Sequence, residues 1–327
     1  MGINAESSSA REGASSFSLS RDELANFNAN GFIGPFTLLE PAMMNAQWKQ
    51  LRVQLFDRRN VVYPDALPGS TIYNYDRHLD NAFLASAISR PEIVGRIASI
   101  LGPDVLCWRT EFLPKYPGEE GHSWRQAFTF GGLSDRGTPH IRWPEGSQFA
   151  GAVTVWIPFT DANEETGCMQ FIPGSQHTMF FDERKGMHYD PDKANGNKTN
   201  GIRRGYFGYD WHELQLDPGW EPEESKAVSV PCHAGQFLIY WSTILHASLP
   251  HPGRTNQAQV ALTVRYVPTS VVIYGDMKGN NKLTESGMSC SLEKYGAVLI
   301  SGRDEYKRNS MRSHTTTGVP FINSNPR

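Results

Sequence analysis

The sequence predicts an α+β fold in which helices buttress a β-sandwich or barrel, and two observations lead to this class. In the first third of the 327-residue chain, apolar residues recur at helical spacing. From about residue 105, short strand-like segments follow one another and are separated by Gly, Pro and Asn. These segments lie too close together for intervening helices, so we expect largely antiparallel sheets.

The helical part shows recognisable start signals. Ser20 and Glu23 form a capping-box pattern, in which each side chain can satisfy the backbone amide of the other residue. Pro41 suits the first turn of a second helix. Ser89 and Glu92 repeat the capping-box pattern ahead of a third apolar stripe. We therefore expect helices that begin near residues 20, 41 and 89.

The strand-rich part carries most of the candidate core. A polar stretch from Asp190 to Gly201 interrupts it, which is typical of a lid or a mobile insertion. We expect one domain over about residues 18–327, with a helical part to about 104, a β core over about 105–275 and an extension over about 276–327. The clearest strand-like segments are DVLCWRTEFLPKY, GAVTVWIPFTD, CMQFIPGS, GQFLIYWSTIL and QVALTVRYVP.

Composition and charge exclude several classes of protein. The 31 Lys and Arg residues nearly balance the 34 Asp and Glu residues, so the net charge of −3 does not indicate a nucleic-acid-binding surface. No apolar run approaches the roughly 20 residues of a membrane helix. Residues 1–17, rich in Ser, Ala and Gly, are expected to form a disordered leader without a signal-peptide core. We expect a cytoplasmic protein with neither a nucleic-acid nor a membrane partner.

The four cysteines are expected to be reduced and mostly buried. They lie far apart in the sequence and form no C-x-x-C pair, which in a chain of this size favours free thiols over a disulfide framework. The four residues are Cys107, Cys168, Cys232 and Cys290.

Two residues of the β core carry a recognisable chemistry. His246 ends a long apolar strand, and Arg265 follows far enough along for the next strand to return beside it. An imidazole can ligate a metal ion, and a guanidinium can grip the carboxylate of a dicarboxylic cosubstrate. From spacing alone, structural roles for both residues remain open.

Longer stretches of sequence resemble one family. The motifs run from about Glu23 to Thr316 and include NGFIGPF, NYDRHLD, LGPDVLCWRTEFLPKYPGEEG, FIPGSQ, RRGYFGYD, AGQFLIYWST, HASLPH and SLEKYGAV. With them the chain closely resembles the non-haem Fe(II)/2-oxoglutarate-dependent aliphatic halogenases of the phytanoyl-CoA dioxygenase superfamily. The resemblance implies a double-stranded β-helix core (jelly-roll, cupin-like) and an oxidoreductase that uses Fe(II), 2-oxoglutarate and chloride. It also implies an aminoacyl substrate on a peptidyl carrier protein of nonribosomal peptide biosynthesis, halogenated at an unactivated aliphatic carbon.

The resemblance also implies roles for individual residues. Ordinary relatives bind iron with two histidines and the carboxylate of an H-x-D motif, whereas halogenases replace that carboxylate with a small residue and so make room for the halide. Matched in this way, His246 is the distal iron ligand, Arg265 binds 2-oxoglutarate, and Ala127 occupies the halide position. Thr154 and Trp156 match positions beside the cosubstrate pocket, although an ordinary inward strand face would look the same.

One departure from the family pattern bears directly on iron. The family reads W-H-Q-A-D-T-F where residues 124–130 read W-R-Q-A-F-T-F, so Arg125 occupies the position of the proximal ligand His and Phe128 replaces an Asp. His122 stands where the nearest relative has a Thr near the cosubstrate, and Gly132 stands where it has an Asn beside the halide site. A guanidinium offers no lone pair to a metal. Its fixed charge about 4 Å from a divalent cation would cost roughly 8 kcal/mol at an effective dielectric constant of 20.

These observations leave alternative functions open. One is a halogenase, or a 2-oxoglutarate-dependent hydroxylase relative, that acts on a carrier-tethered amino acid. Another is a metal-poor, non-catalytic protein that binds a carrier protein or a small anion, in which Arg125 holds chloride or a carboxylate. An Arg125 that arose by engineering or a sequencing error is a third. On a regular strand His122 would face away from residue 125, but a bulge could turn it inward as a substitute ligand; His140 and His233 are expected in loops away from the site.

Overall fold

The computed structural model describes residues 17–147, 151–190, 192, 198–199, 201–275 and 281–325. The expected leader, apart from residue 17, and most of the polar insertion at 190–201 lie outside this part of the chain. The described part is mixed α and β, with more sheet than helix. Its α-helices are α1 (Arg21–Asn30), α2 (Pro41–Gln54), α3 (Ala82–Ala87) and α4 (Pro91–Leu101). No helix among the described residues is both long and apolar enough to cross a membrane.

A six-stranded sheet organises the molecule. Its strands follow the order β1-β10-β5-β12-β2-β16, and every neighbouring pair is antiparallel. The prediction of largely antiparallel sheets is therefore confirmed. The strands of this large sheet are β1 (Phe32–Thr37), β2 (Val105–Lys115), β5 (Val153–Pro158), β10 (Gln236–Trp241), β12 (Gln259–Pro268) and β16 (Val298–Ser301).

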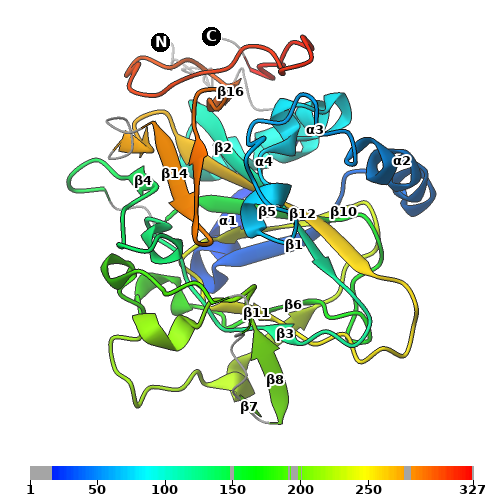
Figure 1. Ribbon diagram of the computed structural model, residues 1–327, viewed down its shortest axis with the longest axis vertical. Helices are drawn as coiled ribbons and strands as arrows, with labels where there is room; N and C mark the ends of the chain where they lie inside the picture. The colour runs from blue at the N-terminus through cyan, green and yellow to red at the C-terminus, as the bar shows by residue number, and fades with distance from the viewer. Residues whose placement is uncertain are drawn as a thin grey trace, which may run out of the picture.

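Smaller sheets complete the β structure. A three-stranded antiparallel sheet has the order β11-β6-β9, and β3 pairs in parallel with β8 beside it. In Figure 1, α2, α3 and α4 gather towards one side of the large sheet, whereas β11, β6, β3 and β8 lie towards the other. The bounds are β3 (Gly121–His122), β4 (Ile141–Arg142), β6 (Met169–Phe171), β7 (Lys198–Thr199), β8 (Ile202–Gly205), β9 (Val228–Val230), β11 (His246–Ser248), β13 (Val272–Ile273), β14 (Lys282–Glu285) and β15 (Met288–Ser291).

Two strands of the large sheet lie outside the expected β core of residues 105–275. β1 comes from the region where the sequence signals only helices, and it pairs with β10 at one edge of the sheet. The Phe36 and Phe237 rings, 5.5 Å apart, pack this edge together. β16 comes from the expected C-terminal extension and pairs with β2 at the other edge. Both ends of the chain therefore help to complete the sheet.

The helix start signals give two confirmed predictions and one wrong one, and Pro41 is confirmed as the first residue of α2. At α1, Ser20 Oγ accepts a hydrogen bond from Glu23 N at 3.2 Å, and Glu23 Oε2 accepts one from Ser20 N at 2.8 Å, which confirms the capping box. The second capping box is wrong. Arg90 occupies the N-cap of α4, because the Ser89 hydroxyl instead donates to the Ser86 carbonyl oxygen at the end of α3 (3.3 Å).

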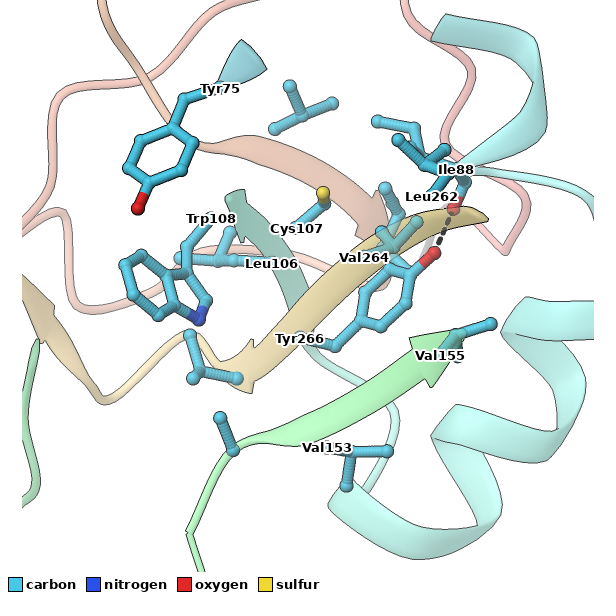
Figure 2. Packing of buried hydrophobic residues seen from close by; sticks show 14 of the residues in the cluster. Tyr75, Ile88, Leu106, Cys107, Trp108, Val153, Val155, Leu262, Val264 and Tyr266 are labelled. Carbon is cyan, nitrogen blue, oxygen red and sulfur yellow. Dashed lines mark hydrogen bonds between the residues drawn. The ribbon is translucent and has the colours of Figure 1, made fainter. Parts of the chain in front are cut away.

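The largest apolar cluster packs α4 against the large sheet. Its residues include Trp108 on β2 and Tyr266 on β12, both fully buried. Figure 2 shows Tyr266 reaching across this cluster to donate a hydrogen bond to the Ile88 carbonyl oxygen, at 2.7 Å. The bond joins the sheet to the segment that links α3 and α4. All four cysteines are buried and free, as the sequence predicts.

We expect Tyr266→Phe to lower the free energy of unfolding by about 1–3 kcal/mol, because it leaves the buried Ile88 carbonyl without its donor. Urea denaturation measures the change. Tyr306→Phe is the matched control, since Tyr306 is exposed, and it should alter stability by less than about 0.5 kcal/mol. Equal stabilities of the two variants would show that the bond contributes nothing.

Candidate functional site

A small cavity is lined by residues of the six-stranded sheet and of the three-stranded sheet that contains β11. β5, β10 and β12 of the large sheet contribute lining residues, as do β11 and the segment that follows β3. The cavity offers about 20 Å³ to a water-sized molecule, which is little more than the space of one water. The chemically important residues in its lining are Arg125, Ala127, Thr154, Glu183, His246 and Arg265.

Backbone pairing sets Arg125 opposite His246. Arg125 N donates to His246 O at 3.0 Å, and His246 N donates to Arg125 O at 3.1 Å. Residues that exchange both hydrogen bonds in an antiparallel pair project their side chains from the same face. The guanidinium therefore occupies the place from which a histidine at position 125 would share a metal ion with His246.

The Arg125 side chain is buried and has no carboxylate partner. It is 5 % exposed, and its Nη1 donates to the Ser123 carbonyl oxygen at 3.1 Å. Its Cζ lies 4.6 Å from the centre of the Tyr206 ring, a cation–π distance. Among the described residues, no Asp or Glu forms an ion pair with it. The guanidinium therefore has no described carboxylate in ion-pair contact, although the Glu111 carboxylate acts on it at longer range.

His246 is a neutral imidazole. Its Nδ1 lies 2.8 Å from the Ile244 carbonyl oxygen, and since a carbonyl can only accept, Nδ1 carries the proton. Burial, assisted by the nearby Arg125 charge, holds the pKa of His246 well below its usual value. The Nε2 lone pair is therefore free, as a metal ligand requires.

Arg265 already has a partner in this structure. Arg265 lies between Thr154 on β5 and Arg109 on β2, and its Nη1 is 2.5 Å from Glu111 Oε1. Burial raises the pKa of Glu111, whereas the Arg265 and Arg109 guanidinium groups together lower it by more. The pKa of Glu111 in the folded protein therefore lies below its ordinary value. The carboxylate is ionised and neutralises the guanidinium that the family resemblance assigns to 2-oxoglutarate.

Five of the eight site residues selected from the sequence line this cavity: Arg125, Ala127, Thr154, His246 and Arg265. The other three do not. Trp156 faces the same way as Thr154 but lies in an apolar cluster with Leu238 and Phe171. Phe128 stacks on Trp143 with ring centroids 5.7 Å apart.

His122 is the third of these residues, and it does not complete a metal site. Its ring packs against Tyr206 and Phe207, with centroid separations of 5.7 and 5.0 Å, outside the cavity lining. His140 and His233 also lie outside that lining, as the sequence predicts. His140 is nonetheless fully buried, with its Nδ1 3.8 Å from Glu285 Oε2.

Glu183 lines the cavity and was missed by sequence reasoning. Its Oε2 accepts hydrogen bonds from Phe128 N (3.0 Å), Thr129 N (2.7 Å) and Thr129 Oγ1 (2.8 Å), which fixes the segment beside Ala127. Its Oε1 is buried without a partner, and burial raises its pKa. The contact spans more than 50 residues of sequence, so no local pattern signals it.

These residues do not fit an Fe(II) ion held in the family manner. His246 offers one imidazole nitrogen, Ala127 offers no ligand atom, and Arg125 brings a positive charge to the third position. No group of three or more His, Cys, Asp or Glu side chains in the described ranges could hold a metal ion. The site therefore retains the enclosure of a metal pocket but lacks its ligand set.

Residues 27–257 match the model of the phytanoyl-CoA dioxygenase (PhyH) family, so the chain belongs to that family. No curated protein matches the chain.

Solved structures extend the similarity over nearly the whole chain. A structure described as "CytC3 with Fe(II) and alpha-ketoglutarate" is 37 % identical with a TM-score of 0.73, covering 94 % of this chain and 99 % of that one. A second CytC3 structure is 39 % identical with the same TM-score, covering 95 % and 98 %. The carbocyclase SnoK, 17 % identical with a TM-score of 0.55 over 85 % and 96 % of the chains, shares the fold.

We expect Glu111→Gln to lower the free energy of unfolding by about 3–5 kcal/mol at pH 7, because it leaves the buried Arg265 charge without its partner. Chemical denaturation measures the loss. Glu165→Gln, which removes an exposed partner of Arg254, should cost less than about 1 kcal/mol.

The same variant gives a pH test. The pKa of Glu111 is lower in the folded state than in the unfolded state, so its stabilisation is complete above the unfolded value of about 4.3. It is lost as the pH falls through the lower folded value. The stability gap between wild type and Glu111→Gln should therefore narrow below about pH 4. A gap that stays constant down to the acid transition would contradict the ion-pair assignment.

We expect Arg125→His to raise the affinity for Fe(II) at least about tenfold, because it removes the repelling charge and adds an imidazole opposite His246. Anaerobic calorimetric titration measures both proteins, with Arg254→His as the surface control. Equal affinities would mean that Arg125 is not what prevents iron binding.

Proposed function

We propose that this chain acts in the halogenase branch of its family, on an unactivated aliphatic carbon of an aminoacyl group tethered to a peptidyl carrier protein. The likeness to the two CytC3 structures over nearly the full length of both chains supports the proposal. So does the antiparallel arrangement of the two main sheets, which suits a double-stranded β-helix core. This function calls for Fe(II), 2-oxoglutarate and chloride, and because Arg125 and Ala127 supply no ligand, Fe(II) would be held weakly and through His246 alone.

The position of Ala127 in the cavity lining is the observation that supports the proposal most directly. Ala127 lines the cavity together with His246 and Arg265. The family resemblance matches it to the carboxylate position of the H-x-D motif in hydroxylating relatives. A methyl group there leaves a coordination position for a halide and favours halogenation over the hydroxylase alternative. Arg265 would bind 2-oxoglutarate by exchanging the Glu111 carboxylate for that of the cosubstrate.

Arg125 favours a second candidate, a non-catalytic protein that binds the loaded carrier protein. With His246 as the only ligand in the lining that matches the family's iron ligands, the scaffold can keep its enclosed pocket and lose tight iron binding. Both candidates share the same partner, the aminoacyl carrier protein. They differ in whether the bound group is chemically changed.

Mass spectrometry of the carrier-bound amino acid separates the candidates. Wild type, Arg125→His and the surface control Arg254→His are incubated with Fe(II), 2-oxoglutarate, chloride, oxygen and carrier proteins loaded with different aliphatic amino acids. The halogenase proposal expects a product with the chlorine isotope pattern, formed at least about tenfold faster by Arg125→His than by wild type.

Other results would select a different function. A hydroxylated product in place of a chlorinated one would assign the hydroxylase alternative. Carrier-protein binding without any product, in wild type and Arg125→His alike, would assign the second candidate. Neither binding nor product would overturn both.

A further inference from the structure

We propose that the cavity beside Arg125 is a metal-independent binding site for a small monovalent anion, with a halide ion as the ligand of best fit. The proposal goes beyond the function given above, and it holds whether or not the chain halogenates a substrate. It turns on the one position where this chain departs from the metal-binding pattern of its family.

The charge pattern of the buried arginines supports an anion. The described residues include five buried arginines, and four of them have a carboxylate within ion-pair distance. Arg125 is the exception, although it is as deeply buried as the others. A buried charge without a partner is strongly unfavourable, so an anion bound at this point would stabilise the folded protein. The four pairs are Arg77–Asp80, Arg109–Glu285, Arg204–Glu224 and Arg265–Glu111.

The guanidinium is held in place to receive such a ligand. Nη1 is fixed by the Ser123 carbonyl oxygen, and the Tyr206 ring supports the flat face of the group. Nε and Nη2 donate to no described residue and remain available as hydrogen-bond donors. A guanidinium whose Nε and Nη2 both keep N–H groups available suits an anion and excludes a cation.

Hydroxyl groups supply further donors. Ser242 lines the cavity, and its Oγ is fully buried without a hydrogen-bond partner among the described residues. Tyr206 and Tyr240 also line it. A buried hydroxyl without a partner is uncommon, and a bound anion would accept its hydrogen bond. Glu183 is the one carboxylate in the lining. Its Oε2 accepts hydrogen bonds from Phe128 and Thr129, whereas its Oε1 is buried without a partner among the described residues, and burial raises the pKa of this carboxyl, which lessens its repulsion of a bound anion.

The volume of the cavity selects the size of the anion. About 20 Å³ accommodates a single ion of roughly the size of a water molecule. The Arg265 guanidinium, which the family resemblance assigns to 2-oxoglutarate, is paired with Glu111. Ala127 contributes to this space, because a longer side chain at this position would fill it.

Chlorine NMR tests the site directly. The metal-free protein, kept in gluconate buffer with a chelator, is titrated with sodium chloride while the chloride line width is followed. Wild type should broaden the signal, and bromide should reverse the broadening more effectively than 2-oxoglutarate does. Arg125→Gln should weaken chloride binding at least tenfold, whereas the surface control Arg254→Gln should leave it unchanged.

Ser242→Ala provides a second, smaller perturbation, and it should weaken chloride binding several-fold. This keeps the proposal testable if Arg125→Gln fails to fold. Chloride broadening that is equal in wild type and in the folded Arg125→Gln protein would overturn the proposal. So would broadening that Ser242→Ala leaves unchanged, or that occurs only after Fe(II) is added. Because no substrate or carrier protein is present, these results are independent of the halogenase assay.

Discussion

The pair of backbone hydrogen bonds between Arg125 and His246 is the constraint on which the chemistry of this site depends. It joins the segment after β3 to β11 and sets both side chains on one face. Backbone pairing does not depend on which side chain stands at position 125. A guanidinium can therefore replace an imidazole without disturbing the register, and the fold of the family persists while a fixed positive charge takes the place of a neutral metal ligand.

Two other buried arginines near the cavity are neutralised by carboxylates of the protein, whereas Arg125 is not paired with any described carboxylate. Arg265 and Arg109 share Glu111, and Arg109 also pairs with Glu285, so the positive charges deeper in the sheet are balanced within the protein. Arg125 forms no ion pair in this network, although its charge also acts on Glu111. The buried carboxylate nearest to the Ala127 segment, Glu183, is committed to the backbone of Phe128 and Thr129. The cavity lining therefore holds a guanidinium that no described carboxylate pairs with.

Sequence patterns predict the features whose interacting residues lie close together in the sequence, and they miss features that depend on distant residues. The Ser20 capping box was predictable because its partners lie three residues apart. Family motifs brought His246, Arg265 and Ala127 to one cavity because matched strands keep their register. No sequence pattern indicates Glu183 or Glu111, because their partners are distant in the sequence. The predicted Ser89 capping box is wrong because the Ser89 hydroxyl donates to a carbonyl oxygen of the preceding helix. The sequence likewise does not predict β1 as an edge strand, because its partner β10 is distant in the sequence.

The central claim is that this cavity attracts an anion where its family binds a metal. Crystals grown with both manganese and bromide, with anomalous diffraction collected at the absorption edge of each element, test it most directly. We expect a bromide peak within hydrogen-bond distance of the Arg125 guanidinium and no manganese peak beside His246 Nε2. A manganese ion bound to His246, with no bromide at Arg125, would contradict the account.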